Sequence, residues 1–409
     1  MQSDTDTTPR GWRSLPRNIW VMTLTSFLTD ISSEMVLNLL PLFLANVLGV
    51  KTNVIGLIEG TAESLSSLLK IVSGNLSDRM GQRKRLAVAG YGISAFAKPL
   101  LYFATSWFGV AFIRFLDRVG KGVRTAPRDA LIADSTPDDR RGLAFGLHRA
   151  GDTLGAVIGV GLALVIVLAT QSGAVELGRV TFQTVVLFSA IPGVLAVVVL
   201  AFGAHEQPRA SATQTPGLAL RGLPSSFKAF LLILALFTLG NSADAFLLLR
   251  AQERGLSVPG VLLMLLTFNL VYASVSVVAG RFSDRVGRKR LILIGWAVYA
   301  VLYLGFALAQ TTWQVWALYA AYGIYYGMFD GTAKALVADL VPAHLRGSAY
   351  GIYNGVIALA ALPASLLAGI LWQGIGSWAG LGASAPFVAG ALLAGAAALL
   401  LTIWQPRTA

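Results

Sequence analysis

A Gly-rich, basic turn with a single acid occurs twice in this chain, each time between two apolar runs. The first copy is GNLSDRMGQRKR at 74–85, and the second is GRFSDRVGRKR at 280–290, a shift of 206 residues (280 minus 74). A second pair, ALIADSTPDDRRG at 130–142 and ALVADLVPAHLRG at 335–347, repeats at a shift of 205 (335 minus 130). Two coincident repeats at about half the chain length predict an internally duplicated membrane protein.

The composition also indicates a membrane protein. Of the 409 residues, 55% are hydrophobic and only 13% are charged, whereas a soluble domain of this size needs far more polar surface. Apolar runs of about 20 residues, the length that crosses about 30 Å of hydrocarbon, recur along the chain. We therefore expect an all-α integral membrane protein with twelve transmembrane helices in two pseudo-symmetric six-helix bundles. The runs are 19–48, 53–73, 87–106, 108–133, 142–170, 181–203, 228–250, 257–280, 290–310, 313–340, 347–373 and 385–404.

One long polar connector and the distribution of basic residues predict the domains and the topology. The predicted domains are an N-terminal six-helix bundle at 1–203, a linker at 204–227 and a C-terminal six-helix bundle at 228–409. Twenty Lys and Arg residues flank the even-numbered loops and both ends of the chain, against only Lys51, Arg179 and Arg254 on the other face. Because basic loops stay in the cytoplasm, both termini are predicted to be cytoplasmic, with the protein in a bacterial inner membrane.

The N-terminal segment and the absence of cysteine restrict processing and chemistry. The first eighteen residues are polar and the first apolar run is too long for a signal-peptide core, so we expect the first helix to remain. The chain has no Cys, which excludes disulfides and thiolate metal sites. The sequence has no nucleotide-binding loop, no His and Cys ligand cluster and no nucleophile motif, so neither an enzyme nor an ATP-driven pump is expected.

The duplicated turn resembles the loop signature of the major facilitator superfamily, G-x-L-x-D-R-x-G-R-K, found between helices two and three and between helices eight and nine. The resemblance covers the whole chain and implies that fold, with secondary transport by alternating access. The run RFLDRVGKGVRTAPRD at 114–129 and the segment TDISSE at 29–34 are similar to a bacterial subgroup of transporters with largely unassigned substrates. Membership of the superfamily says little about the transported molecule.

The same turns predict a conformational latch. Asp78 lies where helix two ends and can pair with Arg79 or Arg83, with Asp134 as a second acid. Gln82 stands where the signature has Arg, a residue that Arg288 keeps, so the latch of the first half is expected to be weaker. In the alternative interpretation these charges only anchor a re-entrant turn at the headgroups. The predicted latch residues are Gly74, Asp78, Arg79, Gly81, Arg83, Asp134, Asp284, Arg285, Gly287, Arg288 and Asp339.

Charged residues within the apolar runs predict a polar cavity in the first half. Each costs roughly 3 kcal/mol on insertion scales, so it must line a cavity or pair. Positions 114, 117/118, 121, 124 and 128 follow one another every three or four residues and therefore share one face of helix four. We call Arg114, Arg118, Lys121 and Arg124 the basic stripe. Acids on helices one, two and five are available to balance it.

Proton coupling is predicted where the basic stripe meets these acids. Arg114, in the string Arg-Phe-Leu, occupies the place of the helix-four Arg that the family links to proton transfer. An Arg keeps its own proton, so its role would be to favour a charged carboxylate until substrate or a conformational change separates the two. Asp30 and Glu34 are favoured because helix one lines the cavity in this fold. The full set of candidates is Asp30, Glu34, Glu59 and Glu63, and static ion pairs are the alternative.

Helix five favours export. It carries Gly146, Gly155 and Gly159 at the spacing of the superfamily's exporter signature, although Val160 and Ala163 replace the signature's Pro and last Gly. Small residues at these intervals also serve close helix packing, which remains the alternative.

The second half is less polar and richer in aromatic residues, which predicts that it supplies shape while the first half supplies coupling. Asp330 and Lys334 are four residues apart and can pair along one face, with tyrosines around them that suit a cyclic or amphipathic substrate. Core or lipid-facing packing is the commoner use of such rings. The predicted substrate-cavity residues are Asp117, Arg118, Lys121, Arg124, His148, Asp152, Asp244, Asn269, Tyr326, Asp330 and Lys334.

The predicted function is secondary active transport of a small organic molecule, driven by protons and directed outward. The alternative is an importer or exchanger of an anionic metabolite or metal chelate, which the basic stripe favours. The expected partners are the small-molecule substrate, protons as the coupling ion and the lipid bilayer. No cofactor, metal or nucleic acid is expected, and the monomer is expected to be functional.

Overall fold

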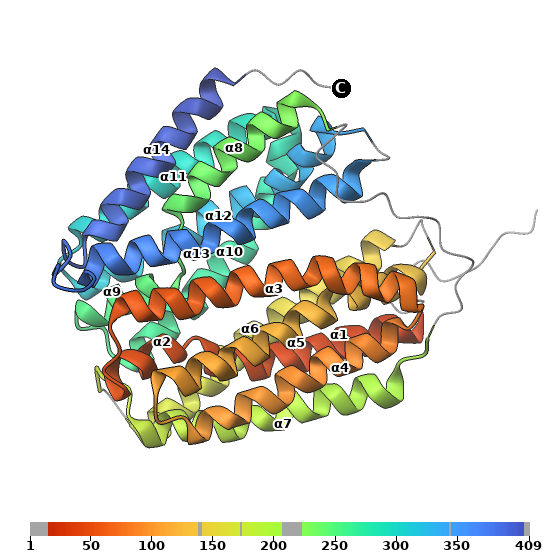
Figure 1. Cartoon of the computed structure of the whole chain (residues 1–409), viewed down its shortest axis with the longest axis horizontal. Helices are drawn as coiled ribbons and strands as arrows, with labels where there is room; N and C mark the ends of the chain where they lie inside the picture. The colour runs from red at the N-terminus through yellow and green to blue at the C-terminus, as the bar shows by residue number, and fades with distance from the viewer. Residues whose placement is uncertain (1–14, 138–140, 172–173, 207–222, 343–344, 405–409) are drawn as a thin grey trace, which may run out of the picture.

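The computed structural model describes residues 15–137, 141–171, 174–206, 223–342 and 345–404, and every long element in these ranges is a helix. In hydrocarbon each backbone N–H and C=O must bond within the chain, and helices satisfy this locally. Figure 1 shows two groups of helices, which we call the first half (α1 to α7) and the second half (α8 to α14).

The observed helices follow the predicted apolar runs closely. The first half contains α1 (Arg17–Leu37), α2 (Leu40–Leu42), the π-helical η2 (Phe43–Val47), α3 (Thr52–Met80), α4 (Arg83–Ala97), the 3-10 helix η3 (Lys98–Phe103), α5 (Trp107–Asp134), α6 (Arg141–Thr170) and α7 (Arg179–Gly203). The second half contains α8 (Ser225–Gly240), α9 (Ala245–Glu253), α10 (Val258–Val286), α11 (Arg288–Leu308), α12 (Thr312–Leu340), α13 (Arg346–Gln373) and α14 (Ala385–Ile403).

When interrupted helices are counted once, the described residues form twelve helical segments. Nine of the segments in these ranges are long and apolar enough to cross a membrane. The other three are α3, α5 and α12, which have 29, 28 and 29 residues and are long enough to span at 1.5 Å per residue. The prediction of an all-helical membrane protein is confirmed. Within the described ranges, nine of the twelve predicted spans have the length and apolarity of a membrane span.

The bundle has two distinct ends. We call the end with the connections after α3, α5, α7, α10 and α12 the basic end, and the other the opposite end. The two halves are joined at the opposite end, where α2 contacts α9 and α3 packs along α13 (Figure 1). The side-chain amides of Asn46 and Gln252 exchange hydrogen bonds of 2.6 and 3.0 Å across this junction. The backbone N–H of Thr52 donates to Gln373 Oε1 at 2.6 Å.

Glycine allows the close packing of α3 on α13. A Cβ at Gly60 would lie 2.9 Å from the Cα of Leu362, a distance that real Cβ atoms essentially never show. Small residues at such crossings let helix backbones approach within a membrane. Nearby, the Ser64 hydroxyl donates to the carbonyl of Ala358 at 2.5 Å, which adds a polar contact between the halves.

The seventh helical segment is broken in the middle. α8 ends at Gly240, residues 241–244 are not helical, and α9 begins at Ala245. The Tyr299 hydroxyl donates to the carbonyl of Gly240 at 2.9 Å, so the break is held by a side chain of α11. A broken membrane helix is tolerated where neighbouring groups satisfy the freed backbone, and such breaks are common at transporter binding sites.

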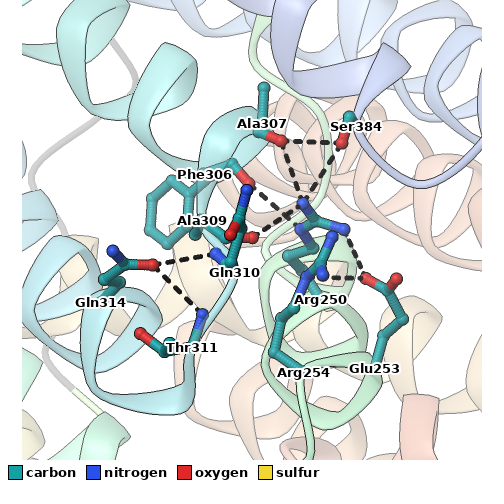
Figure 2. Close-up of polar contacts among 10 residues, drawn as sticks. All are labelled: Arg250, Glu253, Arg254, Phe306, Ala307, Ala309, Gln310, Thr311, Gln314 and Ser384. Carbon is teal, nitrogen blue, oxygen red and sulfur yellow. Dashed lines mark hydrogen bonds and ion pairs between the residues drawn. The ribbon is translucent and has the colours of Figure 1, made fainter.

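α9 is anchored by Arg250, whose side chain is completely buried. Figure 2 shows its guanidinium among carbonyls at the C-terminal end of α11, where a cation is favoured by the helix dipole. The guanidinium donates to Phe306 O at 3.1 Å, Ala307 O at 3.0 Å, Ala309 O at 3.3 Å, Ser384 Oγ at 3.2 Å and Glu253 Oε2 at 2.5 Å. α12 then begins with a capping box between Thr311 and Gln314. These contacts fix the segment that follows the break.

Candidate functional site

A cavity of about 530 Å³ lies between the halves, and both contribute to its wall. Its charged, polar and aromatic lining comes from α1, the residue that follows it, α3 and α5 on one side, and from α8, the break before α9, α10, α12 and α13 on the other. From the first half these lining residues are Glu34, Asn38, Glu59, Glu63, Arg114 and Arg118. From the second half they include Asn241, Asp244, Phe268, Asn269, Tyr319 and Tyr326.

The wall of the first half is a network of ion pairs. Arg114 Nη2 lies 2.7 Å from Glu59 Oε2, and Arg114 Nη1 lies 3.7 Å from Asp117 Oδ2. Arg118 lies 3.6 Å from the same Asp117 oxygen and 4.0 Å from Glu63 Oε2. Asp117 is only 5% exposed and sits between the two guanidiniums. The two arginines at the cavity are therefore balanced by three carboxylates.

Glu34 has a different environment from these three acids. Its Oε2 accepts a 2.8 Å hydrogen bond from the side-chain amide of Asn38, one turn further along the same segment. It forms no ion pair with any Lys or Arg side chain in the described part of the chain. Glu34 therefore presents a half-buried carboxylate to the cavity, supported by a neutral donor.

The glycines of α6 position Glu34 and Asp30. A Cβ at Gly155 would lie 2.5 Å from the carbonyl oxygen of Phe27, and one at Gly159 would lie 2.6 Å from that of Ile31. α1 and α6 therefore pack backbone to backbone at these two positions, as the packing interpretation of the glycine spacing expects. The close approach sets the depth of the two acids on α1.

A second polar layer lies nearer the basic end. The Arg124 guanidinium is 4.4 Å from the ring centroid of Tyr91, Arg128 pairs with Asp129 at 2.8 Å, and His148 Nε2 is 3.7 Å from Asp152 Oδ1. Asp30 interacts electrostatically with this layer. Of the basic stripe, Arg124 belongs to this layer and lies outside the cavity lining.

Lys98 is a buried cation of the first half whose hydrogen bonds go to hydroxyls. Its side chain is 1% exposed, and its Nζ donates to Ser32 Oγ at 2.7 Å and to Ser33 Oγ at 3.0 Å. Both serines belong to α1, so Lys98 ties η3 to the helix that carries Asp30 and Glu34.

The wall of the second half combines one carboxylate with aromatic rings. Asp244, at the end of the break in the seventh segment, accepts hydrogen bonds from Tyr322 at 3.2 Å and from Tyr326 at 3.4 Å. The Phe268 ring lies 5.5 Å from that of Tyr326 and 5.2 Å from that of Tyr319, centroid to centroid. Like Glu34, Asp244 forms no ion pair with a Lys or Arg side chain among the described residues.

An ionic contact between Arg149 and Asp330 links the halves on the basic-end side of this cavity. Arg149 of α6 lies 4.0 Å from Asp330 of α12, and the Tyr272 hydroxyl lies between them, 3.4 Å from each. Asp330 also pairs with Lys334 at 2.8 Å on the same helix, as its spacing predicted. The side chain of Arg149 is 65% exposed, so this bridge is partly solvated.

The basic end repeats one ion pair in both halves. Arg83 pairs with Asp134 and donates to the carbonyl of Ala130 at 2.7 Å. In the second half Arg288 pairs with Asp339 at 2.6 Å and donates to the carbonyl of Ala335 at 2.5 Å. Arginine, acid and carbonyl are all related by a shift of 205 residues (288 minus 83, 339 minus 134, 335 minus 130).

This symmetry corrects the residue equivalence from which a weaker first-half latch was expected. Arg83, not Gln82, takes the place of Arg288, because the first turn has one residue more between its last Gly and the Arg. The Arg83 side chain is 9% exposed against 28% for Arg288, so the first pair is the more buried. The Arg83–Asp134 pair lies within the first half and the Arg288–Asp339 pair lies within the second. The side chains of Asp78, Arg79, Asp284 and Arg285 lie outside the described residues.

The structure brings together part of the predicted site. Of the proposed coupling residues, Glu34, Glu59, Glu63 and Arg114 line the cavity, whereas Asp30 does not. The predicted cavity residues that line it are Arg118, Asp244, Asn269 and Tyr326. Those outside its lining are Asp117, Lys121, Arg124, His148, Asp152, Asp330 and Lys334. The cavity lies at the level of Arg114 and Arg118, and α5 continues from there toward the basic end.

The sequence interpretation missed Asn38, Phe268 and Tyr319. Asn38 carried a usable signal, since it lies one turn after Glu34. The two aromatic residues carried none, because rings in core positions have the same composition and spacing.

Comparisons with known proteins agree with the fold. The profile described as Major Facilitator Superfamily matches residues 22–257 and 229–409. An uncharacterized MFS-type transporter of Methanocaldococcus jannaschii is 39% identical over 370 residues, which cover 88% of this chain and 90% of that protein. The multi-drug resistance efflux pump PmrA of Streptococcus pneumoniae is 24% identical over 344 residues, 81% of this chain and 82% of that protein.

Solved structures show the same architecture. A POT family transporter in complex with 5-aminolevulinic acid has a TM-score of 0.81 at 14% identity, over 97% of this chain and 98% of that chain. The D-xylose-proton symporter has a TM-score of 0.76 at 17% identity, over 96% of this chain and 98% of that chain. The family and these neighbours are transporters, not enzymes. The chain therefore belongs to the major facilitator superfamily, and it is a multi-pass membrane protein of the secondary transporter class.

Proposed function

We propose that this protein exports a small organic molecule in exchange for protons, by rocking of its two halves around the central cavity. The observation that carries the proposal is the placement of Glu34 and of the Arg114–Glu59 pair in the wall of a cavity that both halves enclose. Carboxylates that can gain and lose a proton, next to a substrate-sized space shared by two rocking bodies, are the components of ion-coupled alternating access.

Glu34 is the preferred proton carrier in this proposal. It is half-buried, faces the cavity and is supported by the neutral amide of Asn38, which can hydrogen-bond either the charged or the protonated form. Glu59 is bound to Arg114 at 2.7 Å and would give up that pairing only when the network rearranges. In this proposal the ion pairs of Arg114 rearrange when the state of the cavity changes, and Glu34 exchanges the proton.

Export is supported by the relationship to PmrA, whose name describes an efflux pump, and by the partial glycine spacing of α6. The alternative of anion import rested on the basic stripe. Arg114 and Arg118 are engaged by Glu59, Asp117 and Glu63, and Arg124 stacks on Tyr91 outside the cavity lining. Among the described residues, the cavity lining therefore offers an anion no cation without a carboxylate partner, which favours the export proposal.

The proposed location is a bacterial inner membrane, with the basic end and both termini in the cytoplasm. The excess of Lys and Arg at that end supports this orientation through the positive-inside rule. The opposite end, where the halves are joined, would then face outward. We further propose that residues 1–203 and 228–409 are the two rocking domains, with 204–227 as their cytoplasmic linker.

Proteoliposomes with an imposed proton gradient test this function. A panel of organic cations, neutral molecules and anions is presented to vesicles loaded with a pH-sensitive dye, and compound-dependent proton flux is recorded. We expect the wild-type protein to couple flux to at least one class of compound. Glu34→Gln should reduce coupled flux to the level of empty vesicles but retain counterflow of the compound, because the amide mimics the protonated acid.

Glu176→Gln is the matched control, since Glu176 is an exposed acid near the opposite end and outside the cavity lining. It should leave coupled flux unchanged. Wild-type proton dependence in both Glu34→Gln and Asp30→Asn would refute the assignment of coupling to α1.

A further inference from the structure

We propose that the transported molecule is an organic cation, whose positively charged nitrogen binds Asp244 while its apolar part lies against Tyr319, Tyr326 and Phe268. Glu34 faces the same space from the first half. The inference rests on the proposed function and adds the class of substrate to it.

The charge of the cavity supports a cationic ligand. Four acids line it, Glu34, Glu59, Glu63 and Asp244, against two basic residues, Arg114 and Arg118. Both arginines are engaged by carboxylates, including Asp117 behind the wall. The two lining acids left without an ion-pair partner among the described residues are Glu34 and Asp244. A half-buried carboxylate without a counter-charge is costly, and a bound cation removes that cost.

These two acids belong to opposite halves. Glu34 lies on α1, and Asp244 lies at the break between α8 and α9. Both line the same cavity as Tyr319. A cation held here contacts both rocking bodies at once, which a substrate must do if its binding is to bias their relative position.

The immediate surroundings of Asp244 suit an ammonium group with an attached ring. The Tyr322 and Tyr326 hydroxyls donate to the two carboxylate oxygens, one to each, at 3.2 and 3.4 Å. Each oxygen keeps a further lone pair for a ligand N–H. Tyr319, Tyr326 and Phe268 add ring surfaces that attract a cation by their quadrupole and an aromatic group by stacking.

The break in the seventh segment adds neutral oxygen acceptors to the same place. Asn241 and Ser242 line the cavity with Asp244, and the Asn241 Oδ1 lies 3.4 Å from the Tyr299 hydroxyl and 3.5 Å from that of Tyr322. Acceptors at an unwound helix in a transporter also suit an inorganic cation. The size of the cavity, about 530 Å³, and its aromatic wall favour the organic ligand.

Equilibrium binding to the purified protein in micelles tests the inference without any proton gradient. The probes are 1-naphthylmethylammonium and its neutral counterpart 1-naphthylmethanol, with benzylammonium and tetraphenylphosphonium as smaller and larger cations. We expect at least one cation to bind, and naphthylmethylammonium to bind at least ~10-fold more tightly than the alcohol. Asp244→Asn should weaken cation binding by a similar factor and leave binding of the alcohol unchanged.

Three variants separate charge from packing. Glu176→Gln is again the control, an exposed acid outside the cavity lining, and should bind cations as the wild type does. Asp244→Glu keeps the charge and should retain most of the affinity. Tyr326→Phe keeps the ring and removes one hydroxyl, so its loss should be smaller than that of Asp244→Asn. Each variant is first required to elute as a monodisperse species at the wild-type position.

The outcomes distinguish the inference from the proposed function. Equal binding of cation and alcohol, or wild-type cation binding by Asp244→Asn, would overturn the inference while proton-coupled flux still stands. Stabilisation by Na⁺ through Asp244, with no binding of any organic cation, would overturn it in favour of an inorganic coupling-ion site. Asp244-dependent cation binding without a proton-dependent flux would support the inference and refute the proton coupling.

Discussion

The two halves of this protein share one framework but have different interiors. At the basic end the Arg83–Asp134 pair of the first half and the Arg288–Asp339 pair of the second occupy equivalent positions, and each arginine also reaches the equivalent carbonyl. At the cavity the equivalence is lost, since the first half presents ion pairs and the second presents tyrosines around one carboxylate. The duplication has therefore kept the ends of the helices and varied the wall.

Arg114 and Arg250, both within membrane-spanning segments, illustrate the same difference between the halves. Arg114 of the first half is paired with carboxylates at the cavity, where its partners can change during transport. Arg250 of the second half is surrounded mainly by backbone carbonyls at the end of α11 (Figure 2) and is not part of the cavity lining. We therefore expect charge to serve coupling in the first half and structure in the second.

The largest effect is expected for Arg250→Gln. The change leaves the carbonyls of Phe306, Ala307 and Ala309 without their buried donor, and removing one partner of a buried charged network costs about 3–5 kcal/mol. The free energy of unfolding in mixed micelles, followed by circular dichroism against denaturing detergent, measures the loss. The folded fraction should keep the wild-type proton dependence.

Arg254→Gln is the control for that prediction. Arg254 lies 3.7 Å from Glu253 and is 28% exposed, so its loss should cost less than about 1 kcal/mol. If Arg250→Gln instead proved as stable as wild type and altered proton coupling, the assignment of a purely structural role to the second-half cation would be wrong.

The sequence predicted the helices more accurately than the residues of the site. The apolar runs gave bounds within a few residues because the length of hydrocarbon sets the length of each helix. α3 was predicted to end at 73 and ends at Met80, and α10 was predicted to end at 280 and ends at Val286. The last turns of both helices are polar, so the apolar run stops before the helix does. Helix existence depended on local composition, which the sequence contains in full.

The site depended on features that local composition does not contain. The turn after α3 contains one additional residue, so Arg83 takes the role that the sequence interpretation assigned to the position of Gln82. Only the contacts of the Arg83 side chain reveal this register. Tyr319 lines the cavity whereas Tyr325, six residues along the same helix, does not, although both are only 1% exposed. Residues of one type on one helix can be told apart only by what packs against them.

Arg114→Gln is expected to have the next largest effect, now on function. Glu59 loses a 2.7 Å ion pair and Asp117 loses one of two cations, so the carboxylates of the wall should no longer respond to conformation. We expect gradient-driven flux to fall by about 10- to 100-fold, equivalent to roughly 1.4–2.7 kcal/mol. The measurement is the initial rate of proton-coupled flux in proteoliposomes.

A double-mutant cycle with Glu59→Gln sharpens this prediction. If the two residues act as a pair, the double variant should be no more impaired than Arg114→Gln alone, because its wall holds no unpaired charge from either residue. Additive losses would show that the pair is not the functional unit, and the contrast between the halves would then have to rest on Glu34.

The smallest effect is expected for Arg149→Gln, which removes the ionic contact between the halves without touching the cavity wall. Arg149 is 65% exposed and lies 4.0 Å from Asp330, so the bridge is worth at most about 1 kcal/mol and should weaken in high salt. Its loss should ease separation of the halves on the basic-end side, by up to ~5-fold in population.

The chain has no Cys, so Asn269→Cys places a single thiol in the cavity, and its rate of reaction with a membrane-impermeant maleimide in inside-out vesicles reports that separation. Lys334→Gln is the control, since Lys334 shares the partner Asp330 but lies on the same helix and does not link the halves. Faster labelling in Arg149→Gln alone would place a gate between α6 and α12, whereas equal acceleration in both variants would mean that the charge of Asp330, and not the bridge between the halves, sets the rate.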